Sequence, residues 1–450
     1  MAISATTSQL IPTMLEQVNP NLPSLLSNER SKFANMFEKA NPKHQVSVWS
    51  AGTVGSGGVS AFRVPVWLSN GGDYQGITLD GGDLGTGSQG YSAFMTLGPF
   101  ESDIAYNVPY RSTIATKTNK QAIVSALTKA VGGAIKEQAL YDEIGLFQAG
   151  DGVLATATAV DTTTGTAGAT LVYTLDTAFG PNRLRGYKAL LDITDSAGVI
   201  RSTSARVAAI NWAANTVSVV VGTTFTAAAT DQLVFPGMGP VTSTTIASGS
   251  WRYGLYTYNT TTTSGSLNGL AYSAAAELAC PVVNAAGGAW NASLVFAGKS
   301  QITQRRDDKQ IEGLVGVCHT AQRTAWYLQG LTIANNMLRN GESVKSTDTA
   351  GQGTELSATF EAGDITTYVS RYANKTRVDN LVPKNFGQVQ EQETQFFTSS
   401  EGQRMFVGRS ATTGNPQAGQ QFYVVATNNL YSIDPGCSIV TYSLSIPAGQ

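Results

Sequence analysis

The chain carries few residues of the types and spacings that catalysis requires. Its two histidines, His44 and His319, lie far apart in the sequence. A hydrolase triad built on His319 would need a serine nucleophile, and no Gly-x-Ser-x-Gly sequence occurs. His319 directly follows an apolar run that ends at Cys318, so we interpret it as a structural residue. Cys-x-x-Cys and His-x-x-x-His spacings are also absent. We therefore expect no catalytic residue, no metal and no cofactor.

A glycine-rich stretch, 85–90, matches the Gly-x-Gly-x-x-Gly pattern of phosphate-binding loops. No strand signal precedes it and no helix signal follows it, so we interpret it as a loop tip. Asp73, Asp80 and Asp83 near this tip could hold calcium, although acidic side chains in a glycine loop are more often only solvated.

The cysteines Cys280, Cys318 and Cys437 are odd in number and widely spaced. This spacing disfavours a disulfide framework and indicates buried thiols in a reducing compartment.

Charged residues make up only 13% of the 450 residues, and the net charge is −2. Such a chain is either an ordinary β-rich protein with a Thr/Ser surface, or one whose surface is largely covered by partners. The basic pair Arg305-Arg306 is followed at once by Asp307-Asp308, so strong gripping of nucleic acid is not expected. We also expect no secretion signal and no membrane partner, because apolar stretches such as 207–230 are interrupted by Thr, Ser and Asn.

One long helix is predicted from Thr118 to Gly150, and the remaining segments are arranged around it. Thr118 and Gln121 form a capping-box pair, and Gly150 is a plausible stop. Apolar residues recur three or four positions apart, at Val124, Leu127, Val131, Ile135, Leu140, Ile144 and Phe147. Gly132-Gly133 weakens the middle of this helix, so packing must stabilise it.

The residues before the helix have no core of their own. Residues 1–45 are a proline-punctuated arm with a short helix, capped by Ser27 or Asn28 and ended by Asn41-Pro42. Within 46–115, Ser60–Leu68 and Tyr91–Leu97 are expected to pair as a long hairpin, which we call the ribbon. Arm and ribbon must lie on other surfaces, either of this chain or of a neighbouring copy.

Strand signals dominate the residues after the helix. Within 151–245 we predict a small barrel or sandwich with strands over 171–175, 187–194, 199–207, 216–221 and 232–235. Further on, helices over 291–306 and 320–338 flank a buried strand over 313–318, and strands follow over 405–409, 421–426 and 438–446. The predicted class is α+β.

This order of elements resembles the major capsid proteins of tailed bacteriophages, which have the Hong Kong 97 type fold. Residues 129–147 look like the spine helix of that family. Residues 167–221, with the phrases DTAFGPNRLRG and AANTVSVVV, look like the β-module that many members carry, and 313–338 look like the centre of the axial domain. The resemblance implies an arm (1–45), an extended loop with P-domain strands (46–115), a spine helix (116–150), an inserted β-module (151–245), an axial domain (246–430) and a returning terminal strand (431–450).

The resemblance implies a structural shell subunit, not an enzyme. Copies would form hexamers and pentamers of an icosahedral head around double-stranded DNA, assembled in the host cytoplasm and located in the virion. A scaffolding protein, a portal and a decoration protein are the implied partners, with only weak, non-specific proximity to DNA. Some members cross-link through a ribbon lysine, but no lysine lies between Lys43 and Lys117. We expect a shell without such links, and we expect that a separate scaffold is needed because no long charged N-terminal extension is present.

Candidate interface residues follow from the same scheme, each with ordinary internal packing as the alternative. They are Phe33 and Phe37 in the arm, Arg63, Trp67 and Tyr91 in the ribbon, and Glu101 with Arg111 as a charge pair at its base. Leu127, Val131, Ile135 and Leu140 are expected to be spine-helix core.

Two other classes remain open. An encapsulin-type compartment would share the fold and enclose enzymes in place of DNA. A β-rich tail or adhesion protein, or a secreted carbohydrate hydrolase, would have little helix, and the hydrolase would need two facing carboxylates.

Overall fold

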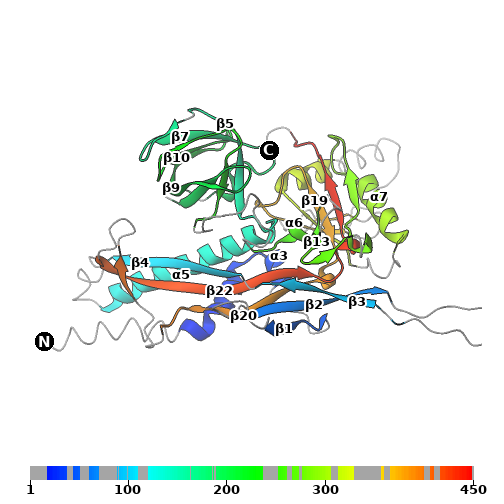
Figure 1. The fold of residues 1–450 in the computed structure, drawn as a ribbon, viewed down its shortest axis with the longest axis horizontal. Helices are drawn as coiled ribbons and strands as arrows, with labels where there is room; N and C mark the ends of the chain where they lie inside the picture. The colour runs from blue at the N-terminus through cyan, green and yellow to red at the C-terminus, as the bar shows by residue number, and fades with distance from the viewer. Residues whose placement is uncertain are drawn as a thin grey trace, which may run out of the picture. The chain divides into compact units, whose positions relative to one another are not determined.

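A computed structural model describes most segments of the chain. These are residues 18–37, 44–50, 60–69, 89, 91–98, 100–109, 120–162, 164–184, 186, 189–236, 252–260, 266–272, 276–305, 313–328, 356–358, 365–399, 406–409 and 416–447. The chain divides into two compact units, and Figure 1 shows their elements. Unit 1 comprises 1–40, 98–146 and 388–429, and unit 2 comprises 41–97, 147–387 and 430–450.

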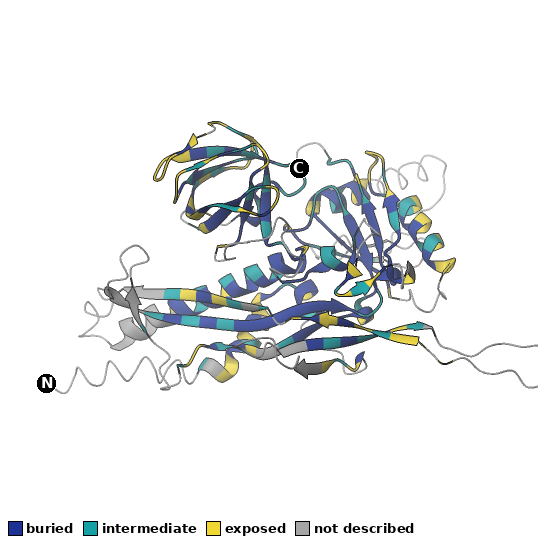
Figure 2. Ribbon diagram, in the orientation of Figure 1, coloured by how far each residue is buried: buried dark blue, intermediate teal, exposed yellow. Residues whose placement is uncertain are grey.

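Unit 1 is built on the long helix α5, Lys120–Leu146. A four-stranded sheet accompanies it, formed by β4 (Glu101–Pro109), β20 (Phe386–Phe396), β21 (Phe406–Arg409) and β22 (Pro416–Ser432). β4 pairs antiparallel with β22 from Glu101 opposite Thr427 to Pro109 opposite Gly419. The apolar residues of α5 supply the core with Leu22, Leu26, Phe396, Phe422 and Val424, and Figure 2 shows much of the helix buried.

The expected helix 118–150 differs from α5 at its ends. Thr118 lies outside the described residues, and the helix ends at Leu146. Phe147 forms a turn, and Ala149 makes a β-bridge to Tyr253. Gly150 has a φ of 86° and lies beyond this turn, so it is not the helix stop.

The arm helix begins earlier than predicted. η1 (Asn19–Asn21) leads into α2, Leu22–Glu29, and Pro23 occupies the first turn, where its missing N–H costs no hydrogen bond. Ser27 and Asn28 therefore lie inside α2 and do not cap a helix. Arg30 is extended, and the Ser31 side chain caps the short α3, Lys32–Asn35, by accepting from the Ala34 N–H at 3.1 Å. α2 packs on α5 of its own chain. Of the two surfaces expected for the arm, this chain or a neighbouring copy, these arm residues therefore lie on their own chain.

The paired glycines of α5 have different surroundings. A Cβ atom on Gly133 would lie 2.7 Å from the Tyr106 Oη and 3.2 Å from its Cζ, whereas a Cβ on Gly132 meets nothing within 4 Å. Tyr106 comes from β4 and stacks on Phe422 with ring centroids 5.8 Å apart. A methyl group at position 133 would therefore displace the Tyr106 ring, whereas one at position 132 would meet open space.

Alanine substitutions should separate these two glycines. Gly132→Ala is expected to stabilise the protein by about 1 kcal/mol, because alanine has the better helix propensity. Gly133→Ala is expected to destabilise it by roughly 1–3 kcal/mol, because the methyl group displaces Tyr106. Denaturant unfolding of both variants beside the parent checks this. Equal effects of the two substitutions would contradict it.

A buried ion pair holds the arm to the spine helix within unit 1. Arg30 Nη2 donates to Asp142 Oδ2, and the side chains are 3% and 5% exposed. Gln138 Nε2 donates to the other carboxylate oxygen at 3.1 Å. Removing one partner of such a pair leaves a buried, uncompensated charge.

Breaking this pair should cost more than replacing it. Arg30→Ala is expected to destabilise the chain by about 3–5 kcal/mol. The double variant Arg30→Met with Asp142→Leu should lose much less than the sum of its two single variants, because no charge remains buried. Urea unfolding of the four species gives the coupling energy, and additive single-variant costs would rule the pair out as a coupled unit.

Unit 2 contains the ribbon, a barrel and a mixed sheet. The ribbon is a three-stranded antiparallel sheet of β1 (Ser47–Ser50), β2 (Ser60–Ser69) and β3 (Tyr91–Leu97). The predicted hairpin of β2 and β3 is confirmed by their register, with Phe62 opposite Leu97 and Trp67 opposite Ser92. β1 is an additional strand that the sequence did not indicate.

The segment after α5 closes into a barrel with strand order β10-β7-β5-β12-β8-β9 (Figure 1). The strands are β5 (Val153–Val160), β7 (Thr170–Leu175), β8 (Leu190–Thr194), β9 (Ile200–Asn211), β10 (Thr216–Val220) and β12 (Gln232–Val234). β6 (Thr164–Gly165) and β11 (Phe225–Thr226) pair beside it, and η3 (Gly180–Arg183) follows β7. Of the two architectures expected here the barrel is confirmed, and β5 is the strand that was missed.

A six-stranded sheet forms the rest of unit 2, in the order β15-β23-β19-β16-β18-β17. Its strands are β15 (Val282–Asn284), β16 (Val315–Cys318), β17 (Leu356–Ala358), β18 (Ile365–Val369), β19 (Val378–Leu381) and β23 (Ile439–Tyr442). Smaller elements are α6 (Leu255–Tyr258), the hairpin of β13 (Ser266–Leu267) with β14 (Leu270–Ala271), η4 (Ala276–Leu278), η6 (Pro383–Asn385) and η7 (Pro435–Cys437). The core on one side gathers Trp290, Val295, Cys318, Trp326, Val378 and Leu444.

The helices of this sheet agree with prediction at their starts. α7 spans Ala292–Thr303, and Asn291 caps it by accepting from the Leu294 N–H at 3.0 Å. Residues 320–328 are helical, and the rest of the predicted helix, 329–338, lies outside the described residues. One boundary differs: we expected a continuous axial segment over 246–430, but 388–429 groups with α5 because β22 pairs with β4.

Candidate assembly surface and buried polar networks

The ribbon has one buried face and one exposed aromatic face. Side chains alternate along each strand, so Val64 and Met95, which are opposite each other, are both buried. On the other face Trp67 is 66% exposed and Phe94 is 52% exposed. The Arg63 Cζ lies 5.8 Å from the Phe94 ring centroid. Two large aromatic side chains exposed on one sheet face are a candidate contact surface.

The other predicted interface residues have different environments. Tyr91 is 59% exposed and is the first residue of β3, separated by a register shift from the rest of the pairing with β2. Phe33 and Phe37 are buried in their own chain, with ring centroids 5.0 Å apart in an edge-to-face arrangement. Glu101 lies in β4 opposite Thr427, and its side chain is outside the description, as is all of Arg111. The expected charge pair and the interface roles stay predictions.

The four residues predicted for the spine-helix core differ in their surroundings. Val131 and Ile135 are buried, and Leu140 is half-buried. Leu127 lies within α5, and its side chain is outside the description. The glycine-rich stretch 85–90, apart from Gln89, and Asp73, Asp80 and Asp83 are also outside it.

Both histidines are buried and hydrogen-bonded. His44 Nδ1 lies 2.9 Å from the Tyr431 hydroxyl, and its Nε2 lies 2.8 Å from the Lys384 carbonyl oxygen. A carbonyl oxygen only accepts, so Nε2 carries the proton and Nδ1 accepts from the Tyr431 hydroxyl. Burial lowers the pKa of His44, against the Lys384 hydrogen bond, which raises it. These two hydrogen bonds hold the chain just before the ribbon to Tyr431 and Lys384.

The cysteines are free and buried, as the sequence indicated. Burial raises the pKa of the Cys318 thiol to about 12, and it also raises the pKa of Cys280. The Cys280 Sγ donates to the Ser438 carbonyl oxygen at 3.1 Å. Thiols of this kind are unreactive because the thiolate is the nucleophile.

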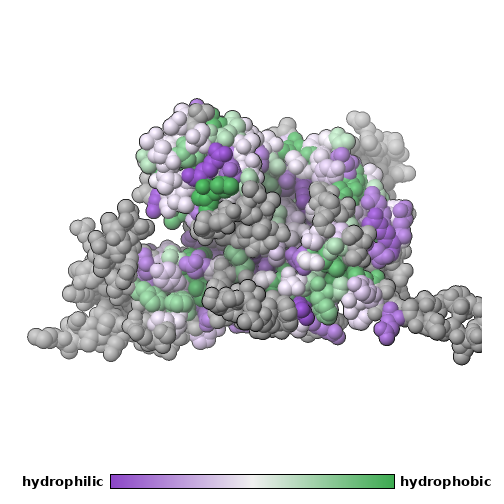
Figure 3. Space-filling view, viewed as in Figure 1, coloured by the Kyte–Doolittle hydropathy of each residue, from purple (hydrophilic) through white to green (hydrophobic). Residues whose placement is uncertain are grey.

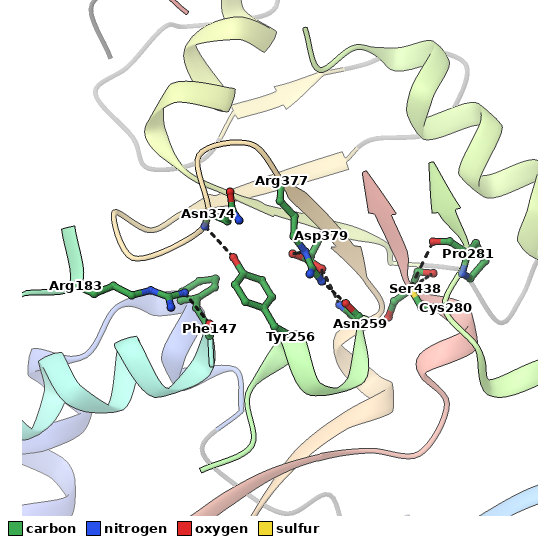
Figure 4. A network of polar contacts seen from close by, with 10 residues as sticks. All are labelled: Phe147, Arg183, Tyr256, Asn259, Cys280, Pro281, Asn374, Arg377, Asp379 and Ser438. Atoms are coloured by element: carbon green, nitrogen blue, oxygen red, sulfur yellow. Dashed lines mark hydrogen bonds and ion pairs between the residues drawn. The ribbon is translucent and has the colours of Figure 1, made fainter. Parts of the chain in front are cut away.

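Sequence inspection missed a network around Tyr256 (Figure 4). Arg183 is 3% exposed, and its Nη2 donates to the Phe147 carbonyl oxygen at 2.7 Å and its Nε to that of Tyr372 at 3.0 Å. The Arg183 Cζ lies 3.7 Å from the Phe179 ring centroid and 5.8 Å from that of Tyr256. Burial lowers the pKa of Arg183 to about 10, so it stays charged at neutral pH. Carbonyl oxygens and aromatic faces therefore stabilise this cation.

A second arginine covers the same tyrosine. The Arg377 Cζ lies 4.2 Å from the Tyr256 centroid, and its Nε and Nη2 donate to the two Asp379 oxygens at 2.9 and 2.6 Å. The Asn259 Nδ2 also donates to Asp379 Oδ1, at 3.3 Å. The Tyr256 hydroxyl accepts the Asn374 N–H at 2.8 Å. Tyr256 thus lies between two guanidinium groups, an arrangement that no local sequence pattern indicates.

The described residues contain no group of three or more His, Cys, Asp or Glu side chains placed to hold a metal ion. Among the helices that the structure describes, none is long and apolar enough to cross a membrane. On the face drawn in Figure 3, hydrophobic and hydrophilic residues are intermixed. Trp212, in the turn between β9 and β10, is a further exposed aromatic residue, 60% accessible.

No protein-family model matches the chain, and no curated protein matches its sequence. Solved structures with a similar course of the chain include phage capsid structures and an encapsulin. The cyanophage A-1(L) capsid asymmetric unit shares 10% identity over 86% of this chain and 89% of that chain, with a TM-score of 0.44. A structure of Gordonia phage Cozz shares 9% identity over 92% and 87%, with a TM-score of 0.41.

The encapsulin is the holo-SrpI complex from Synechococcus elongatus, with 8% identity over 80% of each chain and a TM-score of 0.34. The phage structures thus have the higher TM-scores. All three TM-scores are below 0.5.

The burial of the thiols gives a direct test of these surroundings. Native protein at pH 8 should show no reaction with a thiol reagent over minutes, and unfolding should release three reactive thiols. Ala214→Cys, in the exposed turn between β9 and β10, is the positive control and should react at once. Rapid labelling of Cys280 or Cys318 in the native chain would contradict the assignment.

Proposed function

We propose that this chain is the major capsid protein of a tailed bacteriophage, with a Hong Kong 97 type fold. Its copies form hexamers and pentamers of an icosahedral head that encloses double-stranded DNA. The chain acts as structural material in the virion, assembled in the host cytoplasm, and it catalyses no reaction.

The arrangement of elements supports this proposal. Residues 1–45 serve as the arm, 46–97 as the extended loop, and α5 with β4, β20 and β22 as the spine domain. The six-stranded sheet with α7 serves as the axial domain, and the barrel of β5 to β12 as the inserted module. β23 serves as the returning terminal strand and is paired on both sides, with β15 and with β19.

The observation that carries the proposal is the exposed aromatic face of the ribbon. Trp67 and Phe94 project from a sheet whose opposite face is already buried, so they are available for contact with a neighbouring copy. Covering the exposed part of each side chain would stabilise an interface by roughly 1–3 kcal/mol. A closed shell repeats that contact at every copy, so a modest energy per contact suffices.

The charge composition supports the same proposal. Charged residues are only 13% of the chain, and Arg30, Asp142, Arg183 and Asp379 are buried inside it. These four charges do not contribute to the surface of a chain that already has few, which suits a surface covered by neighbours. Since the ribbon contains no lysine, these contacts are non-covalent there.

Electron microscopy of the purified chain, co-expressed with the neighbouring genes, tests the proposal. Closed shells with five-fold and six-fold capsomers are expected, and DNA inside mature particles. Shells that enclose a co-purifying enzyme would identify an encapsulin-type compartment. Monomers or fibres under the same conditions would count against a shell role.

The ribbon contact has a matched pair of variants. Trp67→Ala should raise the protein concentration needed for assembly about tenfold or more, since ~1.4 kcal/mol per contact is lost. Trp212→Ala removes an equally exposed tryptophan from the barrel and should leave assembly unchanged, with both variants folded by circular dichroism. Equal assembly of Trp67→Ala and the parent would remove the ribbon from the interface.

A further inference from the structure

The segment 176–184, which follows β7 of the barrel and includes η3, contacts residues that flank strands of the six-stranded sheet of unit 2. The Lys375 N–H donates to the Ala178 carbonyl oxygen at 2.7 Å. The Asn182 Nδ2 atom lies 3.1 Å from His319 Nε2. Together with the Arg183 contacts described above, these bonds join the barrel to residues around the ends of β16 and β18.

The His319 ring at this junction is held in one protonation state. It is 6% exposed, and its Nδ1 accepts the Ala321 N–H at 3.1 Å, with the Thr320 hydroxyl at 3.2 Å. A backbone N–H only donates, so Nδ1 must keep its lone pair free. The ring proton is therefore on Nε2. The Asn182 atom placed 3.1 Å from it is Nδ2, which is also a donor, so the amide must turn its oxygen toward Nε2 for the hydrogen bond to form. The junction requires neutral imidazole.

Protonation of Nδ1 would place two N–H groups against each other. The charge that bears on the ring is the Lys375 ammonium, which opposes a second positive charge. Burial first, and Lys375 second, lower the pKa of His319 to about 4.

The other charged groups of the adjoining elements offer no compensation. The Asp176 carboxylate accepts the Phe179 and Gly180 N–H groups. Arg183 is directed to carbonyl oxygens. Arg323 lies one turn further along the helix 320–328 and carries the same sign of charge as Lys375.

We propose that the junction of His319 with Asn182 is an acid-sensitive latch that holds the barrel to the sheet at neutral pH and releases it in acid. The latch needs the ring to accept from Ala321 and donate to Asn182 at the same time, which only neutral histidine does. Its release frees the segment 176–184 while the barrel and the sheet keep their own cores.

The sign of the pH dependence follows from the lowered pKa of His319. The junction is fully stabilised above the pKa of free histidine, 6.5, and the stabilisation is lost as the pH falls through about 4. Between these limits the equilibrium between closed and released junction shifts by about two orders of magnitude.

Hydrogen exchange of the purified full chain, corrected for the intrinsic rate, tests the latch at pH 7.5 and pH 4.5. Exchange of 176–184 should rise in acid by at least tenfold relative to β7 and β10. His319→Asn keeps an acceptor for the Ala321 N–H without a titrating group, and it should remove that rise. His44→Gln changes the other histidine and should leave the rise intact.

A second variant keeps the test decisive if His319→Asn folds poorly. Asn182→Asp places a carboxylate beside the imidazolium, so acid release should be reduced or abolished while the neutral junction is retained. The latch is overturned if exchange rises equally in 176–184 and in β7 and β10, or if His319→Asn keeps the parent's pH dependence.

Discussion

The pairing of β4 with β22 is the interaction on which unit 1 depends. It joins Ser102 to Ala426, 324 positions apart, and it gives α5 a sheet to pack on. An isolated helix of this length with two central glycines would be marginal in water. The close approach of Tyr106 over Gly133 explains why a residue with poor helix propensity occupies that position. The ladder, the helix and the arm helix α2 therefore stabilise one another.

Few charges are present, and several of them are used inside the fold. Arg30 is compensated by Asp142, Arg377 by Asp379, and Arg183 by carbonyl oxygens and aromatic rings. The planar guanidinium group suits these positions, since it stacks on rings and donates in a fixed plane. Interior arginines of this kind fix orientation within each unit more than they add net stability. They leave the surface with little charge.

The exposed aromatic face of the ribbon is a candidate contact surface. In the proposed shell, a neighbouring copy would cover the exposed aromatic face of the ribbon. The histidines and cysteines have structural surroundings. Both histidines are buried, and each makes hydrogen bonds that require a neutral ring; the cysteines are buried as well. At the barrel junction, the same burial that makes His319 a good structural residue makes it sensitive to acid.

The sequence by itself determined most of the local helices and strands. It also showed that the residue spacings typical of hydrolase and zinc sites are absent. Periodicity located α5, the ribbon strands and most of the barrel strands, and Asn291 correctly marked the start of α7. It misplaced the arm helix, because Ser27 and Asn28 have good capping side chains while the extended backbone at Arg30 favours Ser31.

Only the tertiary structure decided which distant segments meet. The barrel closure, the grouping of 388–429 with α5, and the position of Tyr256 between Arg183 and Arg377 all depend on contacts between residues far apart in the chain. Local patterns report which face of an element is apolar. They carry no information on the partner that covers it, because burial energy is non-directional and register is set by packing.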